Sequence, residues 1–151
     1  MKRVLSPSTF AMLAGALSIT ALMTLSATEA AAASRHVVRP DAAGGTTASN
    51  MRGMRGPDGG YAARAGTTSV NPDGSASHRS GFAASGARGN VESSGSATRD
   101  ASGNVTQGRS TTATSAATGN SVQSSTSYSS GTGLTHSATC YSAAGAVIPC
   151  R

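Results

Sequence analysis

Residues 100–108 read DASGNVTQG, and this stretch decides the fold because similar runs recur along the chain. The related runs are GPDGGY at 56–61, NPDGSA at 71–76, ARGNV at 87–91 and ATGNSV at 117–122. Each places a glycine among Asn, Asp or other small residues, which accept the backbone angles of tight turns. The glycine recurs at intervals of 15, 15, 14, 16, 14 and 12 residues. The predicted turn glycines are Gly59, Gly74, Gly89, Gly103, Gly119, Gly133 and Gly145.

Strand-forming residues fill the intervals between these turns. An apolar residue stands two positions after the glycine in most units, as Val105 does after Gly103, so we expect a strand to start directly after each turn. Residues 121–129 alternate with the two-residue period of a strand. The sequence therefore predicts a mostly β protein, with either a meander of short hairpins or a solenoid whose units are about 15 residues long.

A second glycine follows the first after five to seven residues in most units. These glycines are Gly66, Gly81, Gly95 and Gly108. We expect them to divide each unit into two strands of about five residues, the commonest strand length in globular proteins.

Large apolar residues are too few for an ordinary hydrophobic core. Burying one of them contributes about 1.5–3 kcal/mol, whereas ordering a chain of this length costs on the order of 100 kcal/mol. A large disordered fraction is therefore expected beside the β-hairpins. After residue 33 the Leu, Ile, Val and Phe residues are Val37, Val38, Val70, Phe82, Val91, Val105, Val122, Leu134, Val147 and Ile148.

The N-terminus has the pattern of a secretory signal peptide. Lys2 and Arg3 precede an apolar run at residues 10–25, which is shorter than the roughly 20 residues that a membrane-spanning helix needs. Small residues fit a cleavage after Ala33. We expect a signal helix at 1–33, export to the periplasm, cell surface or exterior, and no permanent transmembrane anchor.

Three further segments follow the signal peptide. Residues 34–56 hold Arg, Ala, Gly and Thr without periodicity, which predicts a disordered basic arm. The repeats occupy residues 57–139, and residues 140–151 contain CYSAAGAVIPC. An exported chain with two cysteines is expected to join them. A hairpin about Gly145 would bring Cys140 and Cys150 side by side, and closing this loop contributes about 2.8 kcal/mol on the chain-entropy model.

DASGNVTQG and CYSAAGAVIPC resemble the D-x-x-G-N-V turn units of repetitive exported bacterial proteins, and more distantly the tyrosine-aspartate repeats of bacterial cell-surface and toxin-shell proteins. The resemblance follows the rhythm of residues 56–151, and residues 100–106 fit the motif best. It implies a surface-exposed scaffold of β-hairpins at the cell envelope, without activity of its own.

Arginine supplies every basic side chain after residue 33, and residues 110–146 carry no formal charge. Arginine binds phosphates and carboxylates bidentately, so one hypothesis is binding to lipopolysaccharide, acidic polysaccharide or extracellular DNA. The simpler interpretation is that spaced arginines keep a sparse chain soluble. The candidate polyanion-binding residues are Arg35, Arg39, Arg52, Arg55, Arg64, Arg79, Arg88, Arg99 and Arg109.

Self-assembly is a further hypothesis. Residues 110–128 are rich in Thr, Ser and Ala, with little charge and no Pro, and an exposed edge strand of this kind can pair with another copy.

The sequence lacks the usual catalytic motifs. It has no G-x-S-x-G elbow after a strand, no H-E-x-x-H and no G-x-x-x-x-G-K. The histidines are scattered, and no catalytic residue, metal ligand or cofactor is predicted. We therefore expect a non-enzymatic structural or interaction protein of the bacterial envelope or exterior, with acidic polymers or a second copy as candidate partners.

Overall fold

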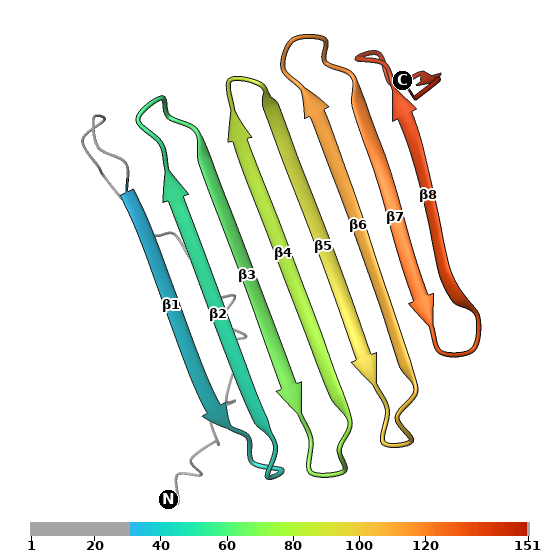
Figure 1. The fold of residues 1–151 in the computed structure, drawn as a ribbon. Coiled ribbons are helices and arrows are strands. Elements are labelled where there is room, and N and C mark those ends of the chain that lie inside the picture. The colour runs from blue at the N-terminus through green and yellow to red at the C-terminus, as the bar shows by residue number, and fades with distance from the viewer. Residues whose placement is uncertain (1–30, 151) are drawn as a thin grey trace, which may run out of the picture.

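The computed structural model describes residues 31–150, which form one open antiparallel sheet of nine strands (Figure 1). The order of the strands in the sheet is their order in the chain. The fold is therefore a meander, which is one of the two predicted arrangements, and it is not a solenoid. The strands are β1 (Ala31–Pro40), β2 (Thr46–Arg55), β3 (Tyr61–Val70), β4 (Ala76–Gly86), β5 (Gly89–Arg99), β6 (Val105–Ser115), β7 (Ser121–Ser129), β8 (Gly133–Tyr141) and β9 (Val147–Ile148).

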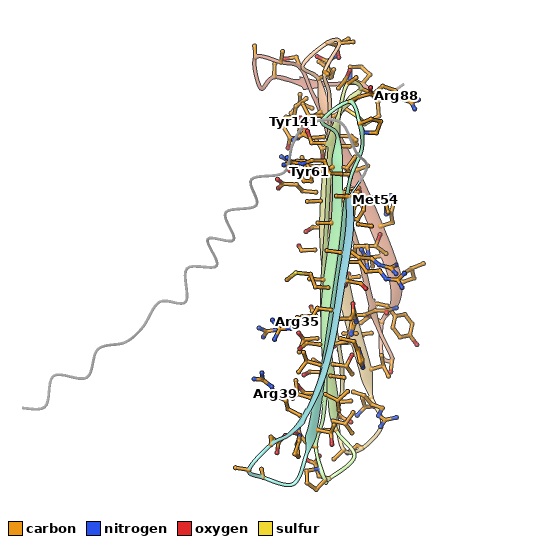
Figure 2. The ribbon with its side chains drawn as sticks, turned by 90° about the vertical axis from the view of Figure 1, so that its left-hand side faces the viewer. Arg35, Arg39, Met54, Tyr61, Arg88 and Tyr141 are labelled. Carbon is orange, nitrogen blue, oxygen red and sulfur yellow. A yellow bond between two sulfur atoms is a disulfide. The ribbon has the colours of Figure 1, made fainter. Side chains whose placement is uncertain are left out.

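The sheet is a single layer. Figure 2 shows it edge-on, with side chains on both faces, and residues 31–150 form no second layer against either face. Among residues 31–150 no hydrophobic side chain is fully buried. The sheet is therefore held by its backbone ladders and by side-chain pairs between neighbouring strands.

Each unit of about 15 residues is one long strand and one turn, not two short strands. The second glycines lie within strands: Gly66 of β3 is opposite Ser80 of β4, and Gly95 of β5 is opposite Arg109 of β6. These glycines have no positive φ, so they continue the extended backbone. The prediction of five-residue strands is wrong for this reason.

The N-terminal part of the described chain also differs from expectation. Residues 34–56, predicted to be a disordered arm, belong mainly to β1 and β2, which pair along their full length. The run DAAGG at 41–45 forms the same kind of turn as the later units, with Gly44 at a φ of 83°. The backbone ladder and this turn order the segment although its side chains show little periodicity.

The signal helix predicted at 1–33 lies outside the described residues except for Ala31, Ala32 and Ala33, which begin β1. Within residues 31–150 no helix has the length and apolar character needed to cross a membrane.

Most turns share one geometry, which the turn at 100–104 illustrates. The Gly103 N–H donates to the Asp100 carbonyl (3.0 Å), and the Asp100 N–H donates to the Asn104 carbonyl (3.0 Å). This is a type I turn followed by a glycine bulge, a common three-residue hairpin loop. The same pair of hydrogen bonds closes the turns that begin at Asp41, Gly56, Asn71 and Ser142.

The turn before β7 is longer. The Ser115 N–H donates to the Asn120 carbonyl (2.8 Å), and the Gly119 N–H donates to the Ser115 carbonyl (2.8 Å). One extra residue in this loop, before the glycine, accounts for the interval of 16 between Gly103 and Gly119. β7 still begins two residues after the glycine, but Ser121 occupies that position and Val122 follows it.

The register separates two kinds of side chain onto opposite faces of the sheet, because directly opposite residues share a face and neighbours along a strand alternate. We call one the apolar face, since it carries most of the large aliphatic side chains and Phe82, and the other the hydroxyl face. The apolar face holds Val38, Val70, Phe82, Val91, Val105, Val122, Leu134 and Ile148. Val37 and Val147 lie on the hydroxyl face.

Candidate interaction surface

The apolar face is open to solvent although it holds the side chains that would normally form a core. Leu134 is 68% exposed, Met54 is 63% exposed and Phe82 is 40% exposed. In Figure 2 Met54 projects from one side of the sheet, and Arg35 and Tyr61 project from the other. These exposed apolar side chains make the face a candidate interaction surface, because exposed apolar patches mark such sites in folded proteins.

Arginines interrupt the apolar face, and one pair stands out. Arg52 of β2 is directly opposite Arg64 of β3, and Arg64 is directly opposite Phe82 of β4. Like charges at directly opposite positions destabilise a sheet. An anion bound between the two guanidinium groups would remove this repulsion, because each can donate two parallel hydrogen bonds to a phosphate or carboxylate.

The other candidate arginines are spread over the sheet. On the apolar face, Arg99 Nη2 donates to the Gly74 carbonyl (2.8 Å) and Arg109 Nη1 donates to Ser93 Oγ (3.0 Å). Arg88 lies in the turn between β4 and β5. The structure therefore does not gather all nine predicted residues into one patch. The hydroxyl face carries Arg35, Arg39, Arg55 and Arg79.

No carboxylate within residues 31–150 lies on the apolar face. The aspartates are in turns, and Glu92 of β5 is opposite Ala83 and Thr112, on the hydroxyl face. The apolar face is therefore both hydrophobic and positively charged. The sequence contained the signal for this arrangement, since the strand alternation that predicts a sheet also assigns each side chain to a face.

Cross-strand hydroxyl pairs are most numerous on the hydroxyl face, and Ser93 and Thr111 form one on the apolar face (2.9 Å). Such pairs stabilise neighbouring strands by roughly 0.2–1 kcal/mol each. They occur in three separate hairpins, so they support the sheet over most of its width. The pairs on the hydroxyl face are Thr47–Ser69 (2.8 Å), Ser49–Thr67 (3.1 Å), Ser94–Ser110 (3.1 Å), Thr98–Thr106 (2.6 Å), Ser125–Ser137 (2.8 Å) and Ser127–Thr135 (2.6 Å).

Aspartates stabilise the turns as charged hydrogen-bond acceptors. Asp100 Oδ1 accepts the Asn104 N–H (2.9 Å) and its Oδ2 accepts the Asn104 side-chain amide (2.9 Å). The hydrogen bond from the Asn104 side chain lowers the pKa of Asp100 most, and the hydrogen bond from the Asn104 N–H has the second-largest effect. The Ser75 side chain and then its N–H lower the pKa of Asp73.

All seven predicted turn glycines have positive φ, and so does Gly44, which was not predicted as a turn glycine. The residue three positions earlier is the sequence signal that marks Gly44. Position i of a type I turn favours Asp, Asn or Ser, as at Asp41, Asn71 and Ser142.

The disulfide between Cys140 and Cys150 is present, as predicted, with a Cα–Cα distance of 5.4 Å. It holds β9 against the end of β8, where Cys140 pairs with Ile148 and Tyr141 pairs with Val147.

The histidines lie on separate strands of the apolar face. His78 Nδ1 is 2.8 Å from Thr68 Oγ1, and His136 Nδ1 is 2.9 Å from Thr126 Oγ1. Within residues 31–150 no group of three His, Cys, Asp or Glu side chains is placed to hold a metal ion.

The sequence and fold were compared with known proteins. No family model, no curated protein and no solved structure matches the chain. The structure defines its class as an all-β protein with an open meander sheet.

Proposed function

We propose that the chain is an exported, non-enzymatic structural or interaction protein of the bacterial envelope or exterior. The observation that carries the proposal is the single-layer sheet, whose two chemically different faces are both accessible. Such a sheet offers a broad, flat surface rather than an enclosed site, which suits an extended partner. The disulfide between Cys140 and Cys150 supports export, because disulfides persist in oxidising compartments.

Cell fractionation tests this proposal. A chain with a C-terminal epitope tag should appear in the periplasmic, surface or extracellular fraction, begin within a few residues of Ser34, and contain no free thiol. The variant Leu17→Arg/Ile19→Arg, which interrupts the apolar run of the signal peptide, should stay in the cytoplasm with its N-terminus intact. Finding the unaltered chain in the cytoplasm, uncleaved and with free thiols, would overturn the proposal.

A second candidate function is binding of acidic polymers through arginine, and the Arg52–Arg64 pair favours it. Of the three candidate ligands, lipopolysaccharide combines phosphates with acyl chains and so matches both the charge and the hydrophobicity of the apolar face. Acidic polysaccharide and DNA match the charge alone.

Paired charge variants test this second function. Arg52→Gln/Arg64→Gln on the apolar face should weaken binding to purified lipopolysaccharide and reduce its dependence on salt. Arg35→Gln/Arg79→Gln removes the same charge from the hydroxyl face and should change binding little. Equal losses for the two variants would show that net charge, rather than the apolar face, determines affinity.

A further inference from the structure

The two edges of the sheet are unequally covered. Within residues 31–150, β1 pairs with β2 alone and its outer edge is free. β8 pairs with β7 along its whole length, but β9 covers only Cys140 and Tyr141 of its outer edge. The part of β8 from Gly133 to Thr139 is therefore free, and exposed strand edges are templates for pairing.

These free edges lie outside the segment that the sequence predicts for self-assembly. Residues 110–128 lie in β6 and β7, which pair with neighbours on both sides. Their backbone groups are already used by the sheet, so that segment offers no edge to another molecule.

The two free edges run in opposite directions. Eight long strands alternate in direction between β1 and β8, so β1 is antiparallel to β8 (Figure 1). If β1 of a second copy lay beside β8, the two strands would be antiparallel, as neighbouring strands are throughout the meander.

The backbone groups on the two edges also match. The Asp41 N–H donates to Gly45 on the β2 side (3.0 Å), and alternation along the strand turns the N–H groups of His36 and Val38 away from β2. Directly after β8 the Ser142 N–H donates to the Ala146 carbonyl on the β9 side (2.8 Å), and alternation along the strand turns the N–H groups of His136 and Leu134 away from β7.

The outward residues of both strands lie on the apolar face. Pairing His36 with His136 and Val38 with Leu134 would satisfy the free backbone groups and keep the apolar faces of two copies on the same side. β8 carries no Lys, Arg, Asp or Glu, so Arg35 and Arg39 of an incoming β1 meet no like-charged arginine on it.

We propose that copies of this chain join edge to edge, with β1 of one copy pairing antiparallel with β8 of the next, to form a continuous sheet. The inference rests on the proposed structural role and names its partner as a second copy. Because the interface is head-to-tail, one edge stays free at each end, and assembly is open-ended unless the curvature of the sheet closes it.

Sedimentation velocity of the purified, oxidised protein over a range of concentrations tests the proposal. The unaltered chain should form oligomers, and His36→Pro should raise the concentration needed by roughly tenfold, because it removes a donor from the outer edge. Ala101→Pro is the matched control: it places Pro at the turn position held by Pro57 and Pro72, and should assemble like the unaltered chain. Circular dichroism should show the same β signal for all three.

Cysteine cross-linking tests the register without depending on the fold of a proline variant. Arg35→Cys/Ser137→Cys places both thiols on the hydroxyl face at opposed positions of the proposed interface and should give a ladder of disulfide-linked oligomers. Ser34→Cys/Ser137→Cys places them on opposite faces and should give at least roughly tenfold less product, because the Cβ vectors diverge.

Three results would overturn the proposal. The first is a monomer at every concentration, and the second is equal cross-linking by the two cysteine pairs. The third is oligomers that His36→Pro leaves unchanged, which would indicate packing between apolar faces. None of these results bears on export, so failure of this proposal is distinguishable from failure of the proposed function.

Discussion

Gly89 begins β5 with a φ of 140°, and a Cβ atom built on it would overlap the carbonyl oxygen of Thr114 on β6. Both the backbone conformation and the close approach of the neighbouring strand require glycine here. Gly108 of β6 has no positive φ and open space where a Cβ would stand. A strand boundary was expected at both glycines, but they have opposite requirements in the sheet.

Alanine substitution should separate these two residues. Gly89→Ala is expected to lower the free energy of unfolding by about 2 kcal/mol or more, through strain and displacement of β6. Gly108→Ala should raise it by up to about 1 kcal/mol, because alanine loses less conformational entropy on folding. Urea unfolding followed by circular dichroism measures both, and similar destabilisation by the two substitutions would contradict the placement of Gly108.

The lowered pKa values of Asp73 and Asp100 predict how the stability of the fold responds to acid. Their pKa values are lowered in the folded chain, so their contribution to stability is complete above the unfolded pKa of about 3.9 and is lost as pH falls through the lower folded values. The melting temperature should therefore drop as pH falls below about 4, the unfolded pKa. Asp73→Asn/Asp100→Asn should flatten this drop, and an unchanged pH profile in the double variant would show that other groups cause it.

At the scale of the hairpin, the sequence predicted the turns better than the strands. A type I turn with a glycine bulge has a local signature, so the intervals located it. Strand length depends on which glycines keep an extended backbone. The amino-acid composition around Gly66 and Gly81 does not show that they do. The residue three positions before each is Ala63 and His78, neither of which favours the start of such a turn. The turn glycines Gly59, Gly89 and Gly119 lack a favourable residue there as well, so this signal separates only some of the turns from the strands.

The C-terminal hairpin is the element that a covalent bond fixes. Reducing the disulfide, or making Cys140→Ser/Cys150→Ser, should release β9, because its two residues alone pair with β8. Stability should fall by up to about 2.8 kcal/mol, the loop-closure value, and amide exchange at Ile148 should accelerate. Exchange at residues in β4 and β5 serves as the internal control. Unchanged protection of Ile148 after reduction would mean that β9 does not need the bond.

At the scale of the whole molecule, the sheet has no interior. Composition correctly indicated that an ordinary core could not form, but it also suggested disorder at residues 34–56, where β1 and β2 form instead. Composition counts side chains, whereas a meander is held by backbone pairing between neighbours, which composition does not report. The separation into two faces depends on the register of all nine strands, so no single unit reveals it.

Calorimetry should detect that the sheet has no hydrophobic core. The heat capacity change of unfolding should fall clearly below the 12–15 cal/mol/K per residue that is usual for globular domains, because little apolar surface is newly exposed. The native protein should also bind the dye ANS on its apolar face, and Phe82→Ser should weaken this signal more than Tyr61→Ser on the hydroxyl face. A normal heat capacity change with no dye binding would mean that the apolar face is covered in solution.

The even number of long strands within residues 31–150 limits how such a chain can change in length over generations. Loss or duplication of a single 15-residue unit would make the two outer strands parallel and exchange the faces of every unit beyond the change. Loss or duplication of two units keeps the two outer strands antiparallel and leaves every side chain on its original face. Variants of this protein that differ in length should therefore differ by whole hairpins of about 30 residues, twice the interval between turn glycines.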